Sequence, residues 1–262
     1  MRTLLGILLS ALFVVSLSTP TLAVEEPVEL THGQVSGVEL ENGVTVFRGI
    51  PFAAPPVGDL RWKAPQPPIP WRGVKVADTF GPACMQGRAP LMSEDCLYLN
   101  VFCPQAGTGA RPVLFWVHGG GFTAGSASQD LYDGGPLATR GDVVVVTINY
   151  RLGPLGFMNL DALTDGRIPA TGNEGLLDQV AALRWVRENI AGFGGNPENV
   201  TIFGESAGGA SIYALLATPL AKGLFHRAIS ESTWITPTNV THLTRGNGFS
   251  DSAEARGQEA IA

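Results

Sequence analysis

Three runs of apolar residues, each bounded by turn-forming residues, set the predicted architecture of this 262-residue chain. The runs begin at Val113, Val143 and Val200, and none shows the alternation of apolar and polar residues that marks a half-exposed strand. Continuous apolar runs of this length are typical of strands buried on both faces of a parallel sheet. The pattern therefore predicts three buried strands.

The strongest helical pattern lies between the second and third runs. Residues 173–190 predict a helix, and the glycine-rich segment 192–195 ends it. Its apolar positions recur at helical spacing: Leu176, Val180, Leu183 and Ile190. A strand, a crossover helix and a second strand imply a mostly parallel sheet flanked by helices, so the predicted fold class is α/β.

An alternating segment and a proline-rich segment precede these elements. Residues 34–38 and 44–48 alternate on either side of Glu41-Asn42-Gly43, which favours a β-hairpin. Residues 49–68 are rich in proline, so we expect an extended chain without helix. A disordered linker is the alternative, but aromatic anchors favour an ordered surface arm: Phe52, Trp62 and Trp71.

The third apolar run leads into a serine between glycines. Gly204-Glu205-Ser206-Ala207-Gly208 follows this run, and the small and apolar residues 209–216 predict a helix after it. Such a strand-to-helix turn exposes the serine hydroxyl, and its glycines let neighbouring backbone approach closely. In a chain with 33 glycines a plain loosened turn is the alternative. The strand before the serine and the helix after it favour a nucleophile.

A second glycine motif follows the first apolar run. In His118-Gly119-Gly120-Gly121-Phe122 the backbone N–H groups can face one concavity, as acyl transfer requires for its oxyanion. Loops of this type are typical of lipases and esterases, in which the N–H after the nucleophile, here that of Ala207, completes the hole. Residues 119–124 also fit a dinucleotide-binding fingerprint. However, no helical pattern opens there, and the second run ends in Asn149-Tyr150-Arg151 instead of an acidic residue.

The N-terminus indicates an exported protein, and the net charge limits its partners. Arg2, the apolar residues 4–17 and Thr21-Leu22-Ala23 form a secretory signal, with cleavage expected after Ala23. A membrane anchor is the alternative, but the apolar stretch is shorter than the roughly 20 residues that span a bilayer. A net charge of −6 argues against nucleic acid or an anionic membrane as partner. We expect a soluble mature chain, secreted or periplasmic.

Three cysteines in an exported chain predict one disulfide and one remaining thiol. Cys84 and Cys96 close a short polar loop, whereas Cys103 lies in the apolar segment 97–102 or just beyond it and is expected to be a packing residue. The histidines lack the spacing of metal ligands, so we expect no metal site: His32, His118, His226 and His242.

These motifs, in this order, resemble the type-B carboxylesterases, a family of the α/β-hydrolase fold that includes cholinesterases and bacterial para-nitrobenzyl esterases. The matching residues are 47–53, 61–62, 93–101, 118–122, 149–153, 172–173, 177–179, 193–197 and 203–209. The resemblance runs from about residue 33 to about residue 232 and corresponds to the N-terminal half of such an enzyme. We therefore expect a signal peptide at 1–23, from the residues described above, and an N-terminal carboxylesterase part at 24–262, which the resemblance implies.

The resemblance also implies roles for individual residues. Ser206 would be the nucleophile, and Gly120, Gly121 and Ala207 would supply the oxyanion N–H groups. The acidic residue beside the nucleophile would be Glu205, with a solvated turn residue as the alternative. Ser232 would bond the catalytic acid, with a helix cap as the alternative. Cys84–Cys96 would be the family's first disulfide, and neither a metal nor an organic cofactor would be needed.

One part of the family pattern is missing. In α/β-hydrolases the chain order is serine, then acid, then histidine, and in this family the last two lie far beyond the serine. The later histidines are His226, which precedes a predicted strand, and His242, which lies in a polar stretch. Neither has a credible acid partner, so the sequence predicts a nucleophile and an oxyanion hole without a base.

Two functions are therefore compatible with the sequence. The first is a carboxylic ester hydrolase that forms an acyl-enzyme on small esters, with this chain as a truncated and inactive part of it. The second is a catalytically inactive, hydrolase-like binding module. Adhesion relatives typically lose the nucleophile, whereas this chain keeps Ser206 and the three glycines, which favours the first. Truncation would also leave the strand after Phe225 as an unpaired, aggregation-prone edge.

Overall fold

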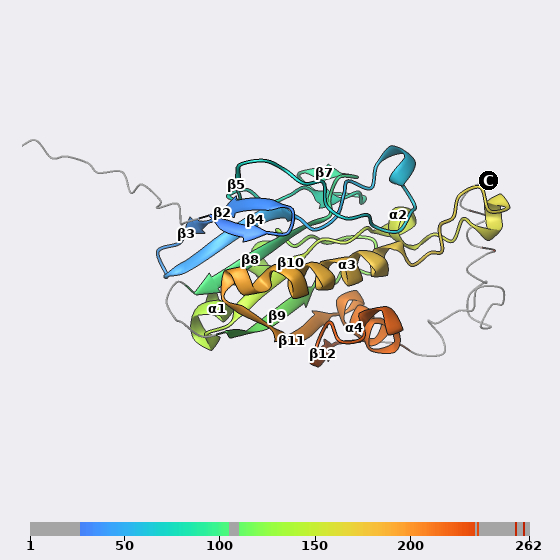
Figure 1. Ribbon diagram of the computed structural model, residues 1–262. Helices are drawn as coiled ribbons and strands as arrows, with labels where there is room; N and C mark the ends of the chain where they lie inside the picture. The colour runs from blue at the N-terminus through green and yellow to red at the C-terminus, as the bar shows by residue number, and fades with distance from the viewer. Residues whose placement is uncertain (1–26, 105–109, 234, 236–254, 256–258, 260–262) are drawn as a thin grey trace, which may run out of the picture.

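A seven-stranded mixed sheet forms the centre of the computed structural model, which describes residues 27–104, 110–233, 235, 255 and 259 (Figure 1). The strand order is β12-β11-β9-β10-β8-β4-β3. Pairing is parallel from β12 to β10 and antiparallel from β10 to β3. The strands are β3 (Val38–Glu39), β4 (Val44–Pro51), β8 (Tyr98–Pro104), β9 (Arg111–Val117), β10 (Val144–Ile148), β11 (Gly195–Glu205) and β12 (Arg227–Glu231).

The predicted buried strands and the predicted helix are confirmed. The three apolar runs are β10, β9 and β11, which lie side by side in parallel, and the helical pattern is α3 (Glu174–Asn189). The chain turns after it through η4 (Ile190–Phe193) to Gly194, whose φ of 75° suits glycine. The other helices are α1 (Gly135–Gly141), α2 (Gly153–Phe157), α4 (Ala207–Ala217), η1 (Gly58–Leu60), η2 (Asp130–Tyr132), η3 (Ala162–Thr164) and η5 (Pro219–Ala221).

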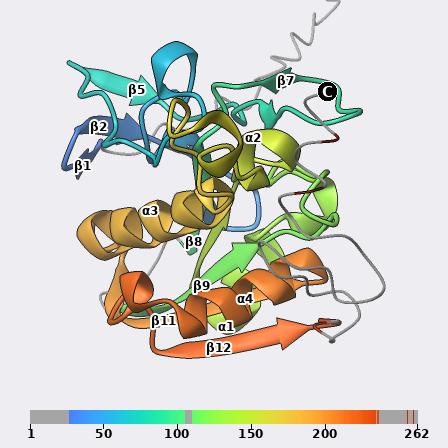
Figure 2. The same cartoon turned by 90° about the vertical axis from the view of Figure 1, so that its right-hand side faces the viewer.

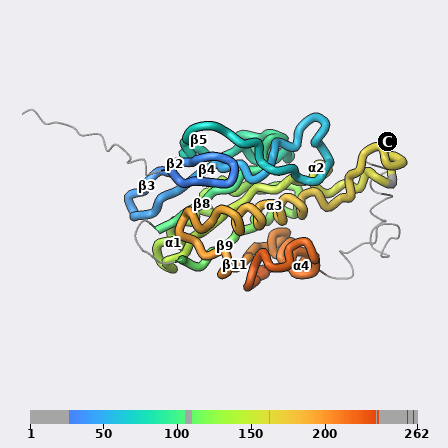
Figure 3. The backbone as a smooth tube through the Cα atoms, in the orientation of Figure 1, coloured from blue at the N-terminus to red at the C-terminus, as the bar shows by residue number. Residues whose placement is uncertain are grey.

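Helices cover the two faces of the sheet unequally. On one face Phe115 and Val146 pack in the same apolar cluster as Leu183 of α3 and Ile212 of α4. These two helices lie along that face (Figure 3). On the opposite face a smaller cluster joins Val145 and its neighbours to α1. Successive residues of a strand point to opposite faces, so the continuous apolar runs serve both clusters.

The N-terminal segment differs in part from the predicted hairpin. β3 and β4 do pair around the turn at 41–43, with Val38 opposite Val46. Residues before Gly37, however, form a separate small sheet of β1 (Val28–Leu30), β2 (Gly33–Ser36) and β5 (Val74–Val76). A Cβ at Gly37 would come within 2.8 Å of the Thr45 side chain. The close crossing at this glycine divides the first arm into two strands.

The proline-rich segment is an ordered arm, as predicted, apart from the single turn η1. Phe52 is buried, and Trp71 donates its indole N–H to the Gln34 carbonyl at 2.9 Å. Trp62 is half-exposed and donates to the Pro154 carbonyl at 3.2 Å. Aromatic anchors therefore fix the arm to the sheet and to α2.

A buried ion pair ties the loop after β10 to α3. Arg151 binds Asp178 through its Nε at 2.8 Å and its Nη2 at 2.7 Å, and both side chains are buried. Nη1 of Arg151 also donates to the Lys63 carbonyl in the arm. Burial raises the pKa of Asp178, and the hydrogen bonds from Arg151 oppose that rise.

The strand β12 lies at the outer edge of the sheet (Figure 2). It pairs with β11 on one side only within the described residues, and its residues are largely exposed. Ile229 is 48% exposed. The expected exposed edge after Phe225 is thus present in the described structure.

Among the described residues, no helix has the length and apolar character needed to cross a bilayer. The predicted signal at 1–23 lies outside the described residues.

Candidate active site

Ser206 occupies a sharp turn between β11 and α4. Its backbone has φ 56° and ψ −117°, a conformation that costs a non-glycine residue roughly 1–3 kcal/mol. The Ser206 N–H donates to the Glu231 carbonyl at 3.0 Å, which ties the turn to the end of β12. The turn predicted from the sequence is confirmed in its geometry.

The glycines on either side of Ser206 permit very close backbone contacts. A Cβ on Gly208 would lie 2.1 Å from the Val117 carbonyl oxygen at the end of β9. A Cβ on Gly204 would lie 2.7 Å from the Gly208 backbone. A side chain at either position would push α4 away from the sheet, so the turn can be this tight only with glycine at both.

The second glycine motif lies directly against Ser206. A Cβ on Gly119 would be 3.2 Å from the Ser206 Cβ and 2.8 Å from the Glu205 carbonyl oxygen. Gly120 and Gly121 follow with φ 109° and 62°. The structure therefore brings together the two motifs that the sequence places more than eighty residues apart.

Several backbone donors at this junction are available. The N–H groups of Gly120 and Gly121 donate to no acceptor among the described residues. Ala207 is the first residue of α4, where an N–H has no partner within the helix. The Gly120 carbonyl is turned away, since it accepts from the Thr123 and Ala124 N–H groups at 3.1 and 3.0 Å. An oxyanion hole requires such donors without partners, and the role of these three N–H groups remains a prediction.

The buried side chain of His118 supports the glycine loop. Its ring is buried and stacks on Tyr150 with centroids 4.5 Å apart, while Nδ1 donates to the Gly119 carbonyl at 2.8 Å. The Tyr150 hydroxyl in turn donates to the His118 carbonyl at 2.8 Å. Burial lowers the pKa of His118 to about 4, although the bond to Gly119 opposes the change. The ring is therefore neutral at pH 7 and holds the loop in place.

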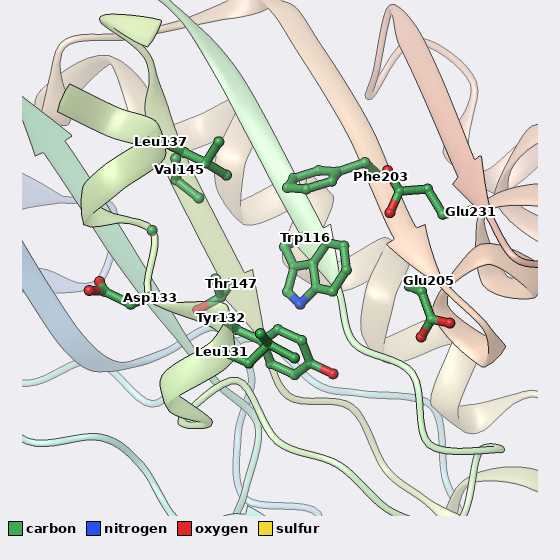
Figure 4. A pocket seen from close by; sticks show the side chains of 11 residues that line it. Trp116, Leu131, Tyr132, Asp133, Leu137, Val145, Thr147, Phe203, Glu205 and Glu231 are labelled. Atoms are coloured by element: carbon green, nitrogen blue, oxygen red, sulfur yellow. The ribbon is translucent and has the colours of Figure 1, made fainter. Parts of the chain in front are cut away.

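A pocket of about 290 Å³ lies on the face of the sheet that carries α1, and Glu205 and Glu231 are among its lining residues (Figure 4). Trp116, Phe203 and Leu137 form apolar walls, and Glu205 lies at one side. Burial raises the pKa of Tyr132, and the charge of Glu205 adds to that effect. Glu205 thus faces this pocket, next to Ser206 in the chain.

Ser232 lies close to the turn, immediately after β12. It is exposed, with φ 50°, and follows Glu231, whose carbonyl accepts the Ser206 N–H. The position is compatible with the predicted bond to a catalytic acid, which remains a prediction.

The described histidine beyond Ser206 is at the wrong end of the sheet. His226 pairs with Val200, and Val200 donates its N–H to His226 Nδ1 at 3.1 Å. Val200 precedes Ser206 by six residues on an extended strand, a separation of about 20 Å at ~3.3 Å per residue. His226 cannot act as base for Ser206. His242 lies outside the described residues.

The structure also shows where the cysteines lie and bears on the alternative nucleotide-binding interpretation. Cys84 and Cys96 form a disulfide that joins β6 (Ala83–Cys84) to the chain after β7 (Met92–Ser93). Cys103 is buried in β8, where its thiol donates to the Thr45 carbonyl, as expected of a packing residue. No helix begins at the glycine loop, because the next helical segments start at Asp130 (η2) and Gly135 (α1), so the nucleotide interpretation is not supported. No cluster of metal-ligating side chains occurs among the described residues.

Sequence reasoning missed the amides that hold the far end of the glycine loop. Asn149 accepts from the Ala127 N–H at 2.8 Å and donates to the Pro82 carbonyl at 2.9 Å. Gln86 bonds both the N–H and the carbonyl of Gly125. An amide has no spacing signature of its own, so only the fold identifies these contacts.

A serine presented between a buried parallel strand and a helix, in contact with a glycine loop from the adjacent strand, is the arrangement of α/β-hydrolases. Within that class the chain belongs to the carboxylesterase family, whose model matches residues 24–257.

Relatives and solved structures agree with this assignment. The chain is 53% identical to the para-nitrobenzyl esterase of Bacillus subtilis (strain 168) over 210 residues, which cover 77% of this chain and 42% of that protein. It is 48% identical to human carboxylesterase 3 over 236 residues, or 81% of this chain and 40% of that protein. A solved PNB esterase matches with TM-score 0.76 and 52% identity over 80% of this chain and 45% of its own. The chain thus spans less than half the length of these relatives.

Proposed function

We propose that this chain carries the nucleophile and the oxyanion donors of a serine carboxylic ester hydrolase. The observation that carries the proposal is the contact between the Ser206 turn and the glycine loop. Gly119 approaches Ser206 so closely that a Cβ there would lie 3.2 Å from the serine Cβ. The family assignment supports the same reaction class.

The proposed reaction proceeds through an acyl-enzyme. The Ser206 Oγ attacks the ester carbonyl carbon while its proton passes to a general base, and the carbonyl oxygen becomes an oxyanion. The N–H groups of Gly120, Gly121 and Ala207 stabilise that charge, an effect of about 3–4 kcal/mol per donor in comparable sites. The C–O bond to the alcohol then breaks, the alcohol leaves with the proton, and water later removes the acyl group.

The general base is the component that the described residues do not supply. His118 is buried and hydrogen-bonded to the Gly119 carbonyl, and burial lowers its pKa. His226 lies at the far end of β11. We infer that in the whole enzyme a histidine and an acid from further along the polypeptide complete the site beside Glu205 and Ser232. Residues 24–262 alone should then be poorly soluble and hydrolyse p-nitrophenyl acetate only at trace rates, unchanged by Ser206→Ala.

Named relatives support the substrate class, and the N-terminal segment supports the location. The B. subtilis relative is a para-nitrobenzyl esterase and a human relative is a cocaine esterase, so we propose small carboxylic esters, without a cofactor and without nucleic acid as partner. Export by a signal at 1–23 is supported by the start of the family match at residue 24 and by the Cys84–Cys96 disulfide. Mature material should begin at Val24.

A hybrid enzyme tests the proposed chemistry. In the esterase hybrid, residues 24–233 of this chain precede the C-terminal half of the B. subtilis para-nitrobenzyl esterase, which supplies the base and the acid. The hybrid should hydrolyse p-nitrophenyl acetate, and Ser206→Ala should lower kcat by at least about 10³-fold. Ser211→Ala removes another hydroxyl of α4, one that accepts a hydrogen bond from Gln179 of α3, and should change kcat by no more than about threefold. Turnover that survives Ser206→Ala would overturn the proposal.

A further inference from the structure

The far end of the glycine loop is fixed by a side chain from the disulfide loop. Gln86 lies two residues after Cys84, in the loop that the Cys84–Cys96 bond closes. Its Oε1 accepts the Gly125 N–H at 3.0 Å, and its Nε2 donates to the Gly125 carbonyl at 2.9 Å. Nε2 also donates to the Cys84 carbonyl at 3.0 Å. One amide therefore connects both backbone groups of Gly125 to the base of the disulfide loop.

Gly125 closes the loop that carries the oxyanion donors. A Cβ on Gly125 would lie 2.3 Å from His118 Nδ1 and 2.6 Å from the Gly119 carbonyl oxygen, so its backbone is pressed against the start of the same loop. Between these ends, Gly120, Gly121 and Phe122 all have positive φ. A positive φ is unfavourable for a non-glycine residue such as Phe122. The loop therefore needs contacts with other segments of the chain to keep this conformation.

Packing does not provide that contact on the Gln86 side. A hollow of about 500 Å³ borders Gln86 and Gly125, with Arg88 and Asp130 among its lining residues. Further along, Asn149 and Asn100 bond Ala127, so they fix the chain two residues beyond Gly125. Within the described residues, the hydrogen bonds to the backbone of Gly125 itself come from Gln86.

We propose that Gln86 is a positioning residue for the oxyanion loop: by bonding both the N–H and the carbonyl of Gly125, it holds Gly120 and Gly121 in place against Ser206. The disulfide fixes the point from which Gln86 reaches. The role of this loop in binding an oxyanion rests on the proposed function. The ordering of the loop by Gln86, however, can be measured without any ester hydrolysis.

Amide hydrogen exchange in the full chain measures the ordering directly, because exchange reports local opening residue by residue. Gln86→Met keeps the length of the side chain and removes every hydrogen bond. It should lower the protection factors of the Thr123, Ala124 and Gly125 amides by about tenfold, as expected for the loss of more than one neutral hydrogen bond. Amides of β9 should keep theirs. Gln129→Met, an exposed glutamine of the same region, is the matched control and should change nothing.

Gln86→Glu provides a rescue that a general loss of structure does not. A protonated carboxyl can accept from the Gly125 N–H and donate to a carbonyl, as the amide does, whereas a carboxylate cannot donate. Protection should therefore be low at about pH 8 and recover toward wild type at about pH 4, below the ordinary glutamate pKa of about 4.3, where most of the carboxyl is protonated. His118, Arg88 and Asp130 are the titratable or charged groups nearby, and wild-type chain measured at both pH values cancels their effect.

Three results would overturn the inference. These are loop protection within about twofold of wild type in Gln86→Met, an equal loss of protection in β9, and no recovery of Gln86→Glu at the lower pH. None of these readouts depends on ester hydrolysis, so a failure of the proposed function leaves them interpretable.

Discussion

Replacement of Gly208 by alanine should damage the fold at the point where α4 meets the sheet. The new Cβ would lie 2.1 Å from the Val117 carbonyl oxygen and 3.0 Å from that of His118, whereas ordinary contact begins at 3.4 Å. The Val117 carbonyl belongs to the end of a central strand, so it cannot rotate away like a flexible side chain. The helix must instead move out by more than 1 Å, which also displaces Ser206 from the glycine loop.

Two opposing terms give the size of the effect. Alanine is favoured over glycine within a helix by about 1 kcal/mol, and overpacking against fixed backbone costs about 3 kcal/mol or more. The net loss of unfolding free energy should therefore be at least about 2 kcal/mol. Gly87→Ala is the matched control, because its Cβ would meet nothing within 4 Å and its backbone has no positive φ. It should leave the stability unchanged or raise it by less than about 1 kcal/mol.

Pulse proteolysis across a urea series measures both variants at the low concentrations that a poorly soluble chain allows. The midpoint of Gly208→Ala should fall clearly below wild type, while that of Gly87→Ala should not. A Gly208→Ala midpoint equal to wild type would refute the reasoning, since it would mean that α4 does not lie as close to β9 as described.

Three further predictions concern groups around the site. Burial lowers the pKa of His118 from 6.5 to about 4. Between these two pH values the unfolded chain binds a proton that the folded chain does not, so the free energy of unfolding should fall as the pH drops from about 6.5 to about 4. His118→Phe should flatten this pH dependence, and an NMR titration of His118 with a midpoint near 6.5 would contradict it. Asp178→Ala leaves Arg151 buried without its partner and should lower the free energy of unfolding in urea by about 3–5 kcal/mol. Glu198→Ala breaks an exposed pair with Arg187 and should lower it by less than about 0.5 kcal/mol. Similar losses in the two variants would show that burial of the pair has no effect. Cys84→Ala/Cys96→Ala should cost about 2–3 kcal/mol, because the bond closes a short loop with a sequence separation of 12, and a reduced pair in exported protein would remove the basis of this estimate.

Much of the site can be predicted from the sequence because its chemistry depends on local backbone geometry. A serine with glycines two residues away on each side, after an apolar run, specifies its own turn, and Ser206 has the strained φ that this pattern implies. Three consecutive glycines after a strand likewise predict a loop of free N–H groups. Adjacent parallel strands then bring the two motifs together, because the carboxyl ends of β9 and β11 lie at the same edge of the sheet.

Other features depend on contacts between distant segments and have no local signal. The sequence gives no reason for Gln86 to meet Gly125, 39 residues away. The division of the first hairpin arm at Gly37 also depends on a distant residue, since Thr45 crosses there. The role of His118 as a support of the glycine loop also has no local signal; its burial and its bond to the Gly119 carbonyl identify it as structural.

The most direct test of the central claim is the site at which a fluorophosphonate reacts with the esterase hybrid. Such a reagent forms a covalent bond only with a serine that is activated by a base and aligned with oxyanion donors. Peptide mapping should show one stoichiometric adduct, on Ser206, and none in the Ser206→Ala variant. An adduct on another serine, or equal labelling of the Ser206→Ala hybrid, would contradict the account.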